Sequence, residues 1–452
     1  MYSIQAKSKF YNRKALKAFM LSGGCIFSAE GFAASLAATP GLTQLQAETG
    51  SSVQAVCGNL IGLGFGPVSN PQTASQDLYN QCSAMVQNGN QIQGSGATGN
   101  SLGLSSAQLG SALQNVATEE MGVSSRVALS SLSGQLAKLS SHMMGLHNKM
   151  GGGAGDDSFE ASRFNLFVNG LGGFGDIKAT STEDGANFNS GGFLVGADYR
   201  FNDNLVTGLA MGYSHVASDF INNVYTSGGS IQSDIFNISA FSTFDIDDSY
   251  VDTIFTYGRS DFDSSRSVVV LSNNSNSVGG ANRTATADPV GNQYSAGVGF
   301  GHNFHFGALT VNPFVRGTYM YGQIDRYSER GAFGLNLDVQ EQEFESAQTI
   351  VGGQLSYVFN QSYGVVIPQI SFSWNHEYKN DARKILASYS ADPAQLTLTA
   401  NTAAPDRDYF LLGGGLSGVL QNGVQLYFNY QTLLGYQNVT SHGFSSGVRI
   451  EF

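Results

Sequence analysis

Apolar and polar residues alternate with a period of two through the last two thirds of the chain. Within residues 366–374, for example, Ile370 and Phe372 share one face, while Ser371 and Ser373 share the other. Successive side chains of a β-strand point to opposite faces, so this pattern predicts strands with one apolar and one polar side. Twelve such runs can be counted, and they centre on residues 164–171, 193–201, 205–215, 231–244, 250–261, 293–304, 310–321, 346–359, 365–377, 409–419, 424–435 and 443–452.

The connections between these predicted strands alternate in length. One set consists of tight turns near residues 202–204, 245–248, 306–307, 360–362 and 421–423. The other set is mostly long and rich in Asn, Ser and Asp, and it covers residues 175–190, 219–230, 263–291, 322–345 and 378–408, with a short last member around Asn438. Short turns at one end and long loops at the other are typical of outer-membrane barrels. We interpret the long connections as solvated loops.

A soluble β-sandwich also alternates, but its outer face meets water and should carry many lysines. Residues 159–452 contain only three, Lys178, Lys379 and Lys384. Charged residues make up 12% of the whole chain, which is about half of the usual ~25%. We therefore predict a mainly β fold in which residues 159–452 form a twelve-stranded antiparallel transmembrane β-barrel, apolar outside and polar inside.

Charged residues within the predicted strands are expected to face the lumen, because a charge on the lipid side costs ~2–4 kcal/mol in mid-membrane. The candidates for this polar lumen are Arg163, Asp198, Arg200, Arg316, Glu377 and Arg449. Such groups could also contact a helix inside the barrel.

The first 33 residues have the three-part layout of a secretory signal peptide. Basic residues precede the apolar stretch 18–29, and small residues follow it, with cleavage expected between Ala33 and Ala34. An amphipathic N-terminal helix and a lipoprotein signal at Cys25 are the alternatives. The formal net charge is −12. Removing the basic segment leaves a still more acidic chain, which argues against nucleic-acid binding.

Removing the signal leaves two cysteines, Cys57 and Cys82. Two nearby thiols in an exported protein are expected to form a disulfide, whereas a catalytic thiol would lack a histidine nearby in sequence. Residues 51–63 and 73–86 are predicted as two short helices that the disulfide joins. Residues 89–103 are predicted as a flexible linker.

Residues 105–149 are predicted as a helix, because apolar residues recur there at spacings of three to five. Serines keep the other faces of this helix small and polar. The apolar residues in the second half of this helix include Val127, Leu132, Leu136, Leu139 and Met143, which we call its apolar line. Two interpretations stay open: a helix of a small soluble domain, or a slim helix suited to a narrow polar tunnel.

Four stretches of the predicted strands resemble the barrel domain of autotransporters, the type V secretion family. They are a Pro-containing strand at 312–319, a Pro-Gln…Trp-x-His-Glu segment at 366–378, a Gly-rich strand at 408–416 and the terminal Arg449-Ile450-Glu451-Phe452. Together with the signal segment, the helix and the strand count, the chain is identified as similar to this family over about two thirds of its length.

The resemblance implies roles for particular segments. Periplasmic chaperones would escort the chain to the barrel-assembly machinery. This machinery would read the last strand through Phe444, Val448, Ile450 and Phe452. The helix near residues 127–149 would thread and plug the pore, and residues 34–126 would be the passenger. This region is short and lacks β-helix repeats. We therefore expect a plug, or a small region displayed at the cell surface, rather than a released passenger.

The expected organisation has four parts: a signal peptide (1–33), a short helical passenger-like region with a linker (34–104), a helix and Gly-rich linker entering the barrel (105–158), and the autotransporter barrel domain (159–452). The expected function is an outer-membrane barrel that translocates or displays its own N-terminal region. A solute channel gated by that region, and an adhesin that acts through the long outer loops, are the alternatives.

No pattern in the sequence indicates an enzyme, a metal site or a cofactor. His142 and His147 are five residues apart, off the i, i+4 spacing of metal ligands on a helix. The Gly-Asp-Asp-Ser sequence at 155–158 is interpreted as a polar linker. We expect a monomeric barrel surrounded by lipid in the outer membrane of a Gram-negative bacterium, with no nucleic-acid partner and with its N-terminal region at the surface.

Overall fold

The structure is a computed structural model that describes residues 34–96, 99–147, 163–180, 183–221, 228–420 and 424–451. The predicted signal segment with Ala33, the Gly-Asp-Asp-Ser sequence and Phe452 lie outside these residues. Ala34 is described and lies in a bend that leads into the short helix η1 (Leu36–Ala38).

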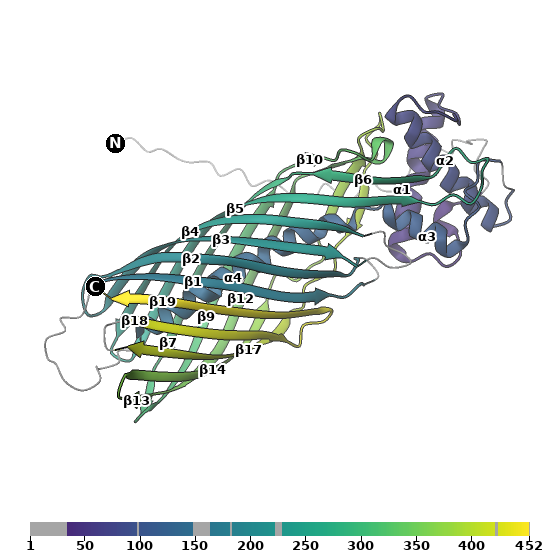
Figure 1. Ribbon diagram of the computed structural model, residues 1–452. Helices are drawn as coiled ribbons and strands as arrows, with labels where there is room; N and C mark the ends of the chain where they lie inside the picture. Colours follow the sequence, from purple (N-terminus) through teal and green to yellow (C-terminus); the bar gives the residue numbers. More distant parts are fainter. Residues whose placement is uncertain are drawn as a thin grey trace, which may run out of the picture.

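Twelve long antiparallel strands form a closed barrel, which confirms the predicted fold (Figure 1). The ring closes because β1 pairs with β19 along its whole length, while β12 pairs with both β9 and β14. Each strand therefore has two neighbours, and no edge faces lipid. The barrel strands are β1 (Phe164–Ile177), β2 (Ala186–Arg200), β3 (Leu205–Phe220), β4 (Gly229–Ile246), β5 (Ser249–Val270), β7 (Val290–His302), β9 (Leu309–Ile324), β12 (Gln342–Tyr357), β14 (Gly364–Glu377), β17 (Asp408–Leu420), β18 (Val424–Leu434) and β19 (Val439–Glu451).

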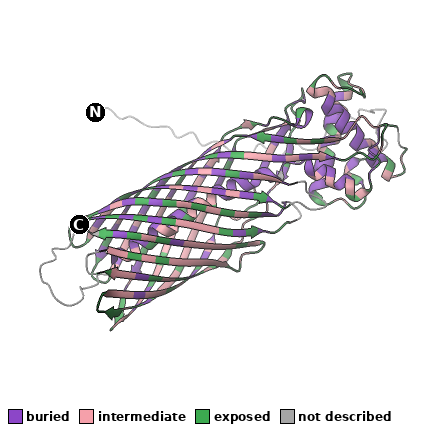
Figure 2. Cartoon of the chain, viewed as in Figure 1, coloured by how far each residue is buried: buried purple, intermediate pink, exposed green. Residues whose placement is uncertain are grey.

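The alternation of the sequence becomes an alternation of burial along much of the barrel wall, most regularly on β3, β4 and β5 (Figure 2). On β5 the side chain of Phe255 is 62% exposed on the outer face, while its neighbour Ile254 is 2% exposed on the inner face. Glycines on the inner side make room for large rings: a Cβ at Gly208 would come within 2.2 Å of the ring of Phe241. The excess of glycine in the composition therefore has a packing role in the barrel wall.

The two ends of the barrel differ, and the difference is larger than the sequence predicted. The tight connections carry only the short β8 (Phe304–Phe306) and β13 (Phe359–Gln361). At the opposite end, which we call the long-loop end, β5 extends to Val270 and pairs with β6 (Ala281–Ala287). Other long loops build a four-stranded sheet from β10 (Tyr327–Ser328), β11 (Leu337–Val339), β15 (Lys384–Tyr389) and β16 (Leu398–Asn401). The prediction of purely solvated loops was wrong there, because strands this short show no alternation in the sequence.

Four α-helices precede the barrel. They are α1 (Gln44–Gly62), α2 (Ala74–Ile92), α3 (Ser106–Asn115) and α4 (Gly122–His147). Capping boxes at Thr43 and Ser105 start α1 and α3, because each side chain accepts a hydrogen bond from a backbone N–H three residues on. Within the described residues, no helix has the length and apolar character needed to cross a bilayer.

Two details of the helical region differ from the prediction. The single helix expected over 105–149 is broken between α3 and α4, where the 3-10 helix η2 (Glu119–Met121) takes the chain from the helices towards the barrel. The segment 89–103, expected as a flexible linker, begins with the last turn of α2, and its last residues pack against the helices. Leu102 is fully buried there, and the Asn88 side chain bonds both the backbone N–H and the carbonyl of Leu104.

The first three helices and the long loops share one apolar core at the long-loop end (Figure 1). We call this assembly the cap: α1, α2 and α3 with β6, the end of β5, the short 3-10 helix η3 (Phe333–Leu335) and the four-stranded sheet. Its core draws on helices and loops alike, and it includes Val56, Leu60, Leu78, Met85, Leu109, Leu113, Val268, Val270, Leu337, Val339, Ala387 and Tyr389. The cap is thus a composite of two chain regions that are far apart in sequence.

Two arginines of the barrel side make polar contacts with the helices. Arg283 of β6 pairs with Asp77 of α2. Arg266 of β5 forms a bidentate pair with Glu329, at 2.9 and 2.6 Å, and also donates to the backbone carbonyl of Asn115 at the end of α3. Bidentate Arg–carboxylate pairs fix geometry as well as adding energy. The seam between helices and loops is therefore specified by charge as well as by apolar burial.

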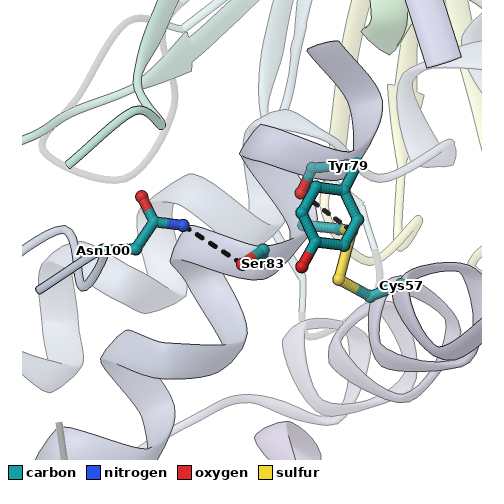
Figure 3. The surroundings of a disulfide bond; sticks show 5 residues. Cys57, Tyr79, Ser83 and Asn100 are labelled. Carbon is teal, nitrogen blue, oxygen red and sulfur yellow. Dashed lines mark hydrogen bonds between the residues drawn. A yellow bond between two sulfur atoms is a disulfide. The ribbon is translucent and has the colours of Figure 1, made fainter. Parts of the chain in front are cut away.

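The predicted disulfide is present and joins α1 to α2 within the cap (Figure 3). Cys57 and Cys82 are both buried, with Cα atoms 5.6 Å apart. Tyr79 lies beside the bond, and Asn100 donates to the hydroxyl of Ser83 one residue further along α2. The bond closes a loop in a small helical unit whose own core is limited.

The junction between cap and barrel, formed by η2 and the loop after β1, holds two buried acidic groups. Glu120 of η2 is buried, and one of its carboxylate oxygens has no hydrogen-bond partner among the described residues. Burial raises the pKa of Glu120 to about 8, against an opposing effect of nearby Arg266. Burial likewise raises the pKa of Asp184, in the loop after β1, to about 6, although Gln114 of α3 donates to it.

The disulfide yields a first prediction. The double substitution Cys57→Ala with Cys82→Ala should cost the cap about 3 kcal/mol, because an open loop has more freedom in the unfolded chain. The barrel should stay folded. Denaturation followed by helical circular dichroism measures the loss. The control Ser83→Ala removes only the bond from Asn100 and should cost about 1 kcal/mol; equal losses for the two variants would contradict the assignment.

The buried acids yield a second prediction. A carboxyl group whose pKa is higher in the folded state destabilises that state as pH rises from the unfolded to the folded pKa. For Glu120 this window runs from 4.5 to about 8, and for Asp184 from 3.8 to about 6. The stability of the cap should therefore fall across this range.

The substitution Glu120→Gln should raise the unfolding free energy of the cap at pH 8 and leave it nearly unchanged at pH 4. Denaturation of the cap at several pH values measures this. The control Glu48→Gln changes a half-buried carboxyl on α1, which accepts a hydrogen bond from Gln44 in its own helix. If Glu120→Gln keeps the pH dependence of the unchanged protein, the assignment is wrong.

Candidate functional site

The candidate site is the inner surface of the barrel with helix α4 against it. Figure 1 shows α4 running from the cap along the barrel, and its residues contact β3, β4, β5, β7, β9 and β12. Hydrogen bonds from the same helix reach Asp198 on β2 and Ser445 on β19. These contacts with many strands of the ring place the helix among their inner faces.

The apolar line predicted for this helix packs against one wall of the barrel. Leu132, Leu136, Leu139 and Met143 form one buried cluster with inward side chains of six strands. The wall side of this cluster consists of Phe167, Leu194, Val206, Ala210, Phe241, Ile254 and Met320. Val127 is buried nearer the cap, in a second cluster with residues of the long-loop end.

The remaining faces of α4 are small or polar, so that the helix can approach the wall closely. Ser131 lies 2.8 Å from Ser214 of β3, hydroxyl to hydroxyl. The Gln135 side chain fits over Gly212, where a Cβ would come within 2.9 Å of the amide. Lys138 donates to the hydroxyl of Ser445 at 3.1 Å.

His142 is held by a carboxylate and an aromatic ring from the wall. Its Nε2 lies 3.0 Å from Asp198, and its ring stacks on Phe167 with 3.8 Å between centroids. Asn165 of β1 donates to the other oxygen of Asp198 at 2.6 Å. The imidazole therefore links the helix to β1 and β2.

His147 makes a similar contact at the last turn of α4, near the short turn between β4 and β5. Its Nδ1 lies 2.6 Å from Asp245 and its Nε2 lies 3.0 Å from Asp252. The ring stacks on Tyr250, with 3.7 Å between centroids. In the described part of the chain, no group of three or more His, Cys, Asp or Glu side chains could hold a metal ion.

The other end of α4 is also tied by charge. Arg126 pairs with Glu183 in the loop after β1. Arg383, from the loop after β14, donates to the hydroxyl of Ser125 at 2.6 Å and lies over the ring of Phe344. Both ends of the helix are thus fixed to the wall by polar contacts, and its middle is fixed by apolar packing.

The structure places the six predicted lumen residues differently from one another. Asp198 contacts α4 directly, whereas Glu377 is buried against Ser346 and Gln348 of β12. The other four are placed as follows: Arg449 is buried, Arg316 lies over the ring of Phe314, and Arg163 and Arg200 lie at the short-turn end, exposed and half-exposed.

The predicted assembly signal lies on the outer face of the terminal strand. Val448 and Ile450 are exposed on β19, and Phe444 is half-buried beside Phe174 and Tyr430. The side chains alternate along the strand as the sequence pattern requires.

Sequence reasoning missed the two histidine contacts, because it tested the histidines only as metal ligands. A signal was present. Asp198, Asp245 and Asp252 all fall on the inward positions of their strands, where a buried carboxylate needs a partner. A helix inside such a barrel is the element that could supply one.

Comparisons with known proteins agree with this architecture. Residues 166–431 match the family model described as the autotransporter beta-domain. The translocator domain of autotransporter NalP from Neisseria meningitidis aligns with a TM-score of 0.55 at 15% identity, over 74% of this chain and 100% of that one. At this identity the likeness shows the fold alone.

Two curated relatives match in sequence. Outer membrane protein A of Rickettsia conorii is 22% identical over 336 residues, which is 73% of this chain and 16% of the relative. Esterase EstA of Pseudomonas aeruginosa is 23% identical over 230 residues, which is 49% of this chain and 32% of the relative. The chain thus spans a third or less of the length of these relatives. Because the matched family model covers more than half of the chain, and the strands it spans complete a twelve-stranded barrel together with β19, the chain belongs to the autotransporter beta-domain family of outer-membrane proteins.

Proposed function

We propose that this protein is an autotransporter-type barrel that carries its own N-terminal region through the outer membrane and keeps it at the cell surface as a folded cap. Helix α4 plugs the pore behind that cap. The observation that carries the proposal is the composite core, in which α1, α2 and α3 pack with the loops of the long-loop end.

The orientation follows from the loop lengths. Outer-membrane barrels place short turns in the periplasm and long loops outside. The cap lies at the long-loop end, so it faces the exterior. Helix α4 begins there at Gly122 and ends at His147, beside Asp245 and Asp252 near the turn between β4 and β5. The chain therefore passes the barrel lengthwise between the cap and β1.

Retention of the cap follows from its attachments. A releasable passenger would need few contacts with the barrel, whereas here Arg266 joins Glu329 to the end of α3 and Arg283 joins Asp77. Separating the helices from the loops would break the Arg283–Asp77 ion pair and the hydrogen bond from Arg266 to the carbonyl of Asn115, and would leave the Asp77 carboxylate without its partner. A folded, attached cap is therefore favoured over a cleaved one.

The plug role of α4 rests on its three sets of contacts: the ion pair of Arg126 near the cap, the leucine cluster in the middle and His147 at the far end. The same contacts make an open solute channel the weaker alternative. The esterase relative does not change the proposal, which includes no catalytic step. The barrel-assembly machinery, periplasmic chaperones and a monomeric state remain expectations of the family.

A surface-tag experiment tests the display. An epitope inserted between Ser69 and Asn70, both exposed in the turn between α1 and α2, should be detected on intact cells and should remain cell-associated. The matched control carries the same epitope between Asn202 and Asp203, exposed in a short turn at the other end. It should be detected only after permeabilisation. The reverse result would place the cap in the periplasm and overturn the proposal.

A cross-link tests the plug. The Ser131 and Ser214 hydroxyls are 2.8 Å apart, so the pair Ser131→Cys and Ser214→Cys should form a disulfide across helix and wall and change migration on non-reducing gels. The control pair Ser133→Cys and Ser214→Cys, two residues further along α4 and on another face, should not cross-link. A folded barrel in which neither pair reacts would exclude α4 from the lumen.

A further inference from the structure

Helix α4 does not fill the barrel, because it packs on one wall and leaves space along the other. Two cavities border it. The larger, of about 620 Å³, reaches from Lys178 and Asn438 at the long-loop end to the middle of the barrel. The smaller, of about 180 Å³, reaches from the middle to Val419 and Gln425 near the short-turn end. Six residues line both of them: Lys138, Ser141, Met144, Gln354, Gln369 and Asn429.

The space follows from small residues on the two facing surfaces. A Cβ added at Gly134 or Gly145 of α4 would meet no atom within 4 Å, and these glycines line the larger and the smaller cavity respectively. Opposite them, Gly413, Gly414 and Gly415 of β17 line the larger cavity. The gap is therefore built into the sequence of both helix and wall.

The barrel wall across these cavities from α4 carries side-chain amides that can form hydrogen bonds with an occupant of the space. Gln354 donates to Gln369 at 2.5 Å, and Gln369 donates to Asn429 at 2.7 Å, which forms a chain of side-chain amides across β12, β14 and β18. All three side chains line the region shared by the two cavities. Polar walls of this kind hold water, whereas an apolar cavity stays dry.

The charged residues that line the smaller cavity are of one sign. In the larger cavity, Glu183 pairs with Arg126 and Glu345 pairs with Lys379. The lining of the smaller cavity contains Lys138 and Arg449 but no carboxylate. Asp198 lies outside this lining and bonds His142 and Asn165.

Lys138 lies at the junction of the two cavities. Its ammonium bonds the hydroxyl of Ser445 and has no carboxylate partner among the residues that the structure describes. Pores lined by Lys or Arg favour anions, because the fixed positive charge raises the local concentration of ions of opposite sign.

We infer that the plugged barrel retains a narrow water-filled path beside α4 that passes small inorganic anions such as chloride, with Lys138 as the residue that sets the anion preference. The inference rests on the proposed position of α4 in the lumen. It adds a conducting activity to a barrel whose proposed role is display.

The test uses the full-length protein in planar lipid bilayers with a gradient of KCl. The unchanged protein should show a small conductance with a reversal potential on the anion-selective side. Lys138→Gln should bring the chloride-to-potassium permeability ratio towards one, and Lys138→Glu should bring it below one, while Lys138→Arg should preserve it. The control Lys384→Gln, exposed on β15 and outside both cavities, should leave the ratio unchanged.

A second variant tests the path without altering charge. Gly134→Phe fills open space next to α4 and should reduce the current several-fold. Heat-modifiable migration on gels confirms that each variant folds. If the unchanged protein conducts no current, while the pair Ser131→Cys and Ser214→Cys still cross-links, the anion path is wrong and the plug stands. If the cross-link does not form, the proposed plug is wrong as well. If the permeability ratio does not change with the charge at position 138, the role of Lys138 is wrong.

Discussion

Lipid around the barrel tolerates no unpaired backbone group, and the rest of the molecule follows from this constraint. The pairing of β1 with β19 closes the ring of strands, and apolar side chains then cover the whole outer face. Polar and charged residues are confined to the interior and to the two ends. A helix in that interior must match a mostly polar wall, which explains why α4 combines one leucine line with serines and two histidines that meet aspartates.

Because of the same constraint, irregular and composite structure forms at the long-loop end and not within the membrane. Strand residues within the membrane have one required pattern, whereas loops beyond it are free to pair with each other and with the N-terminal helices. The cap uses this freedom: β11 and β15 contribute to one side of an apolar core, and α1 and α2 contribute to the other. Glu120, whose pKa burial raises to about 8, lies where the helices lead into the barrel.

Sequence patterns predicted the barrel well, because each strand repeats its alternation over more than ten residues and the loops between strands alternate in length. The disulfide was predictable from the export signal and the count of cysteines. The cap was not, since β10 and β16 have two and four residues and pair with segments far away in the chain. The contacts of His142 and His147 were also missed, because they depend on which strands the helix happens to face.

The divided core of the cap has a consequence for the energetics of export. Leu78 and Leu109 come from the N-terminal region, whereas Leu337 and Tyr389 come from loops that stand at one end of the finished barrel. Neither half can bury its apolar surface alone, so the free energy of cap formation is released only where both halves meet. In the proposed export of the N-terminal region, association at that end would make backward sliding of the chain unfavourable, and the cap would act as a molecular ratchet that needs no external energy source.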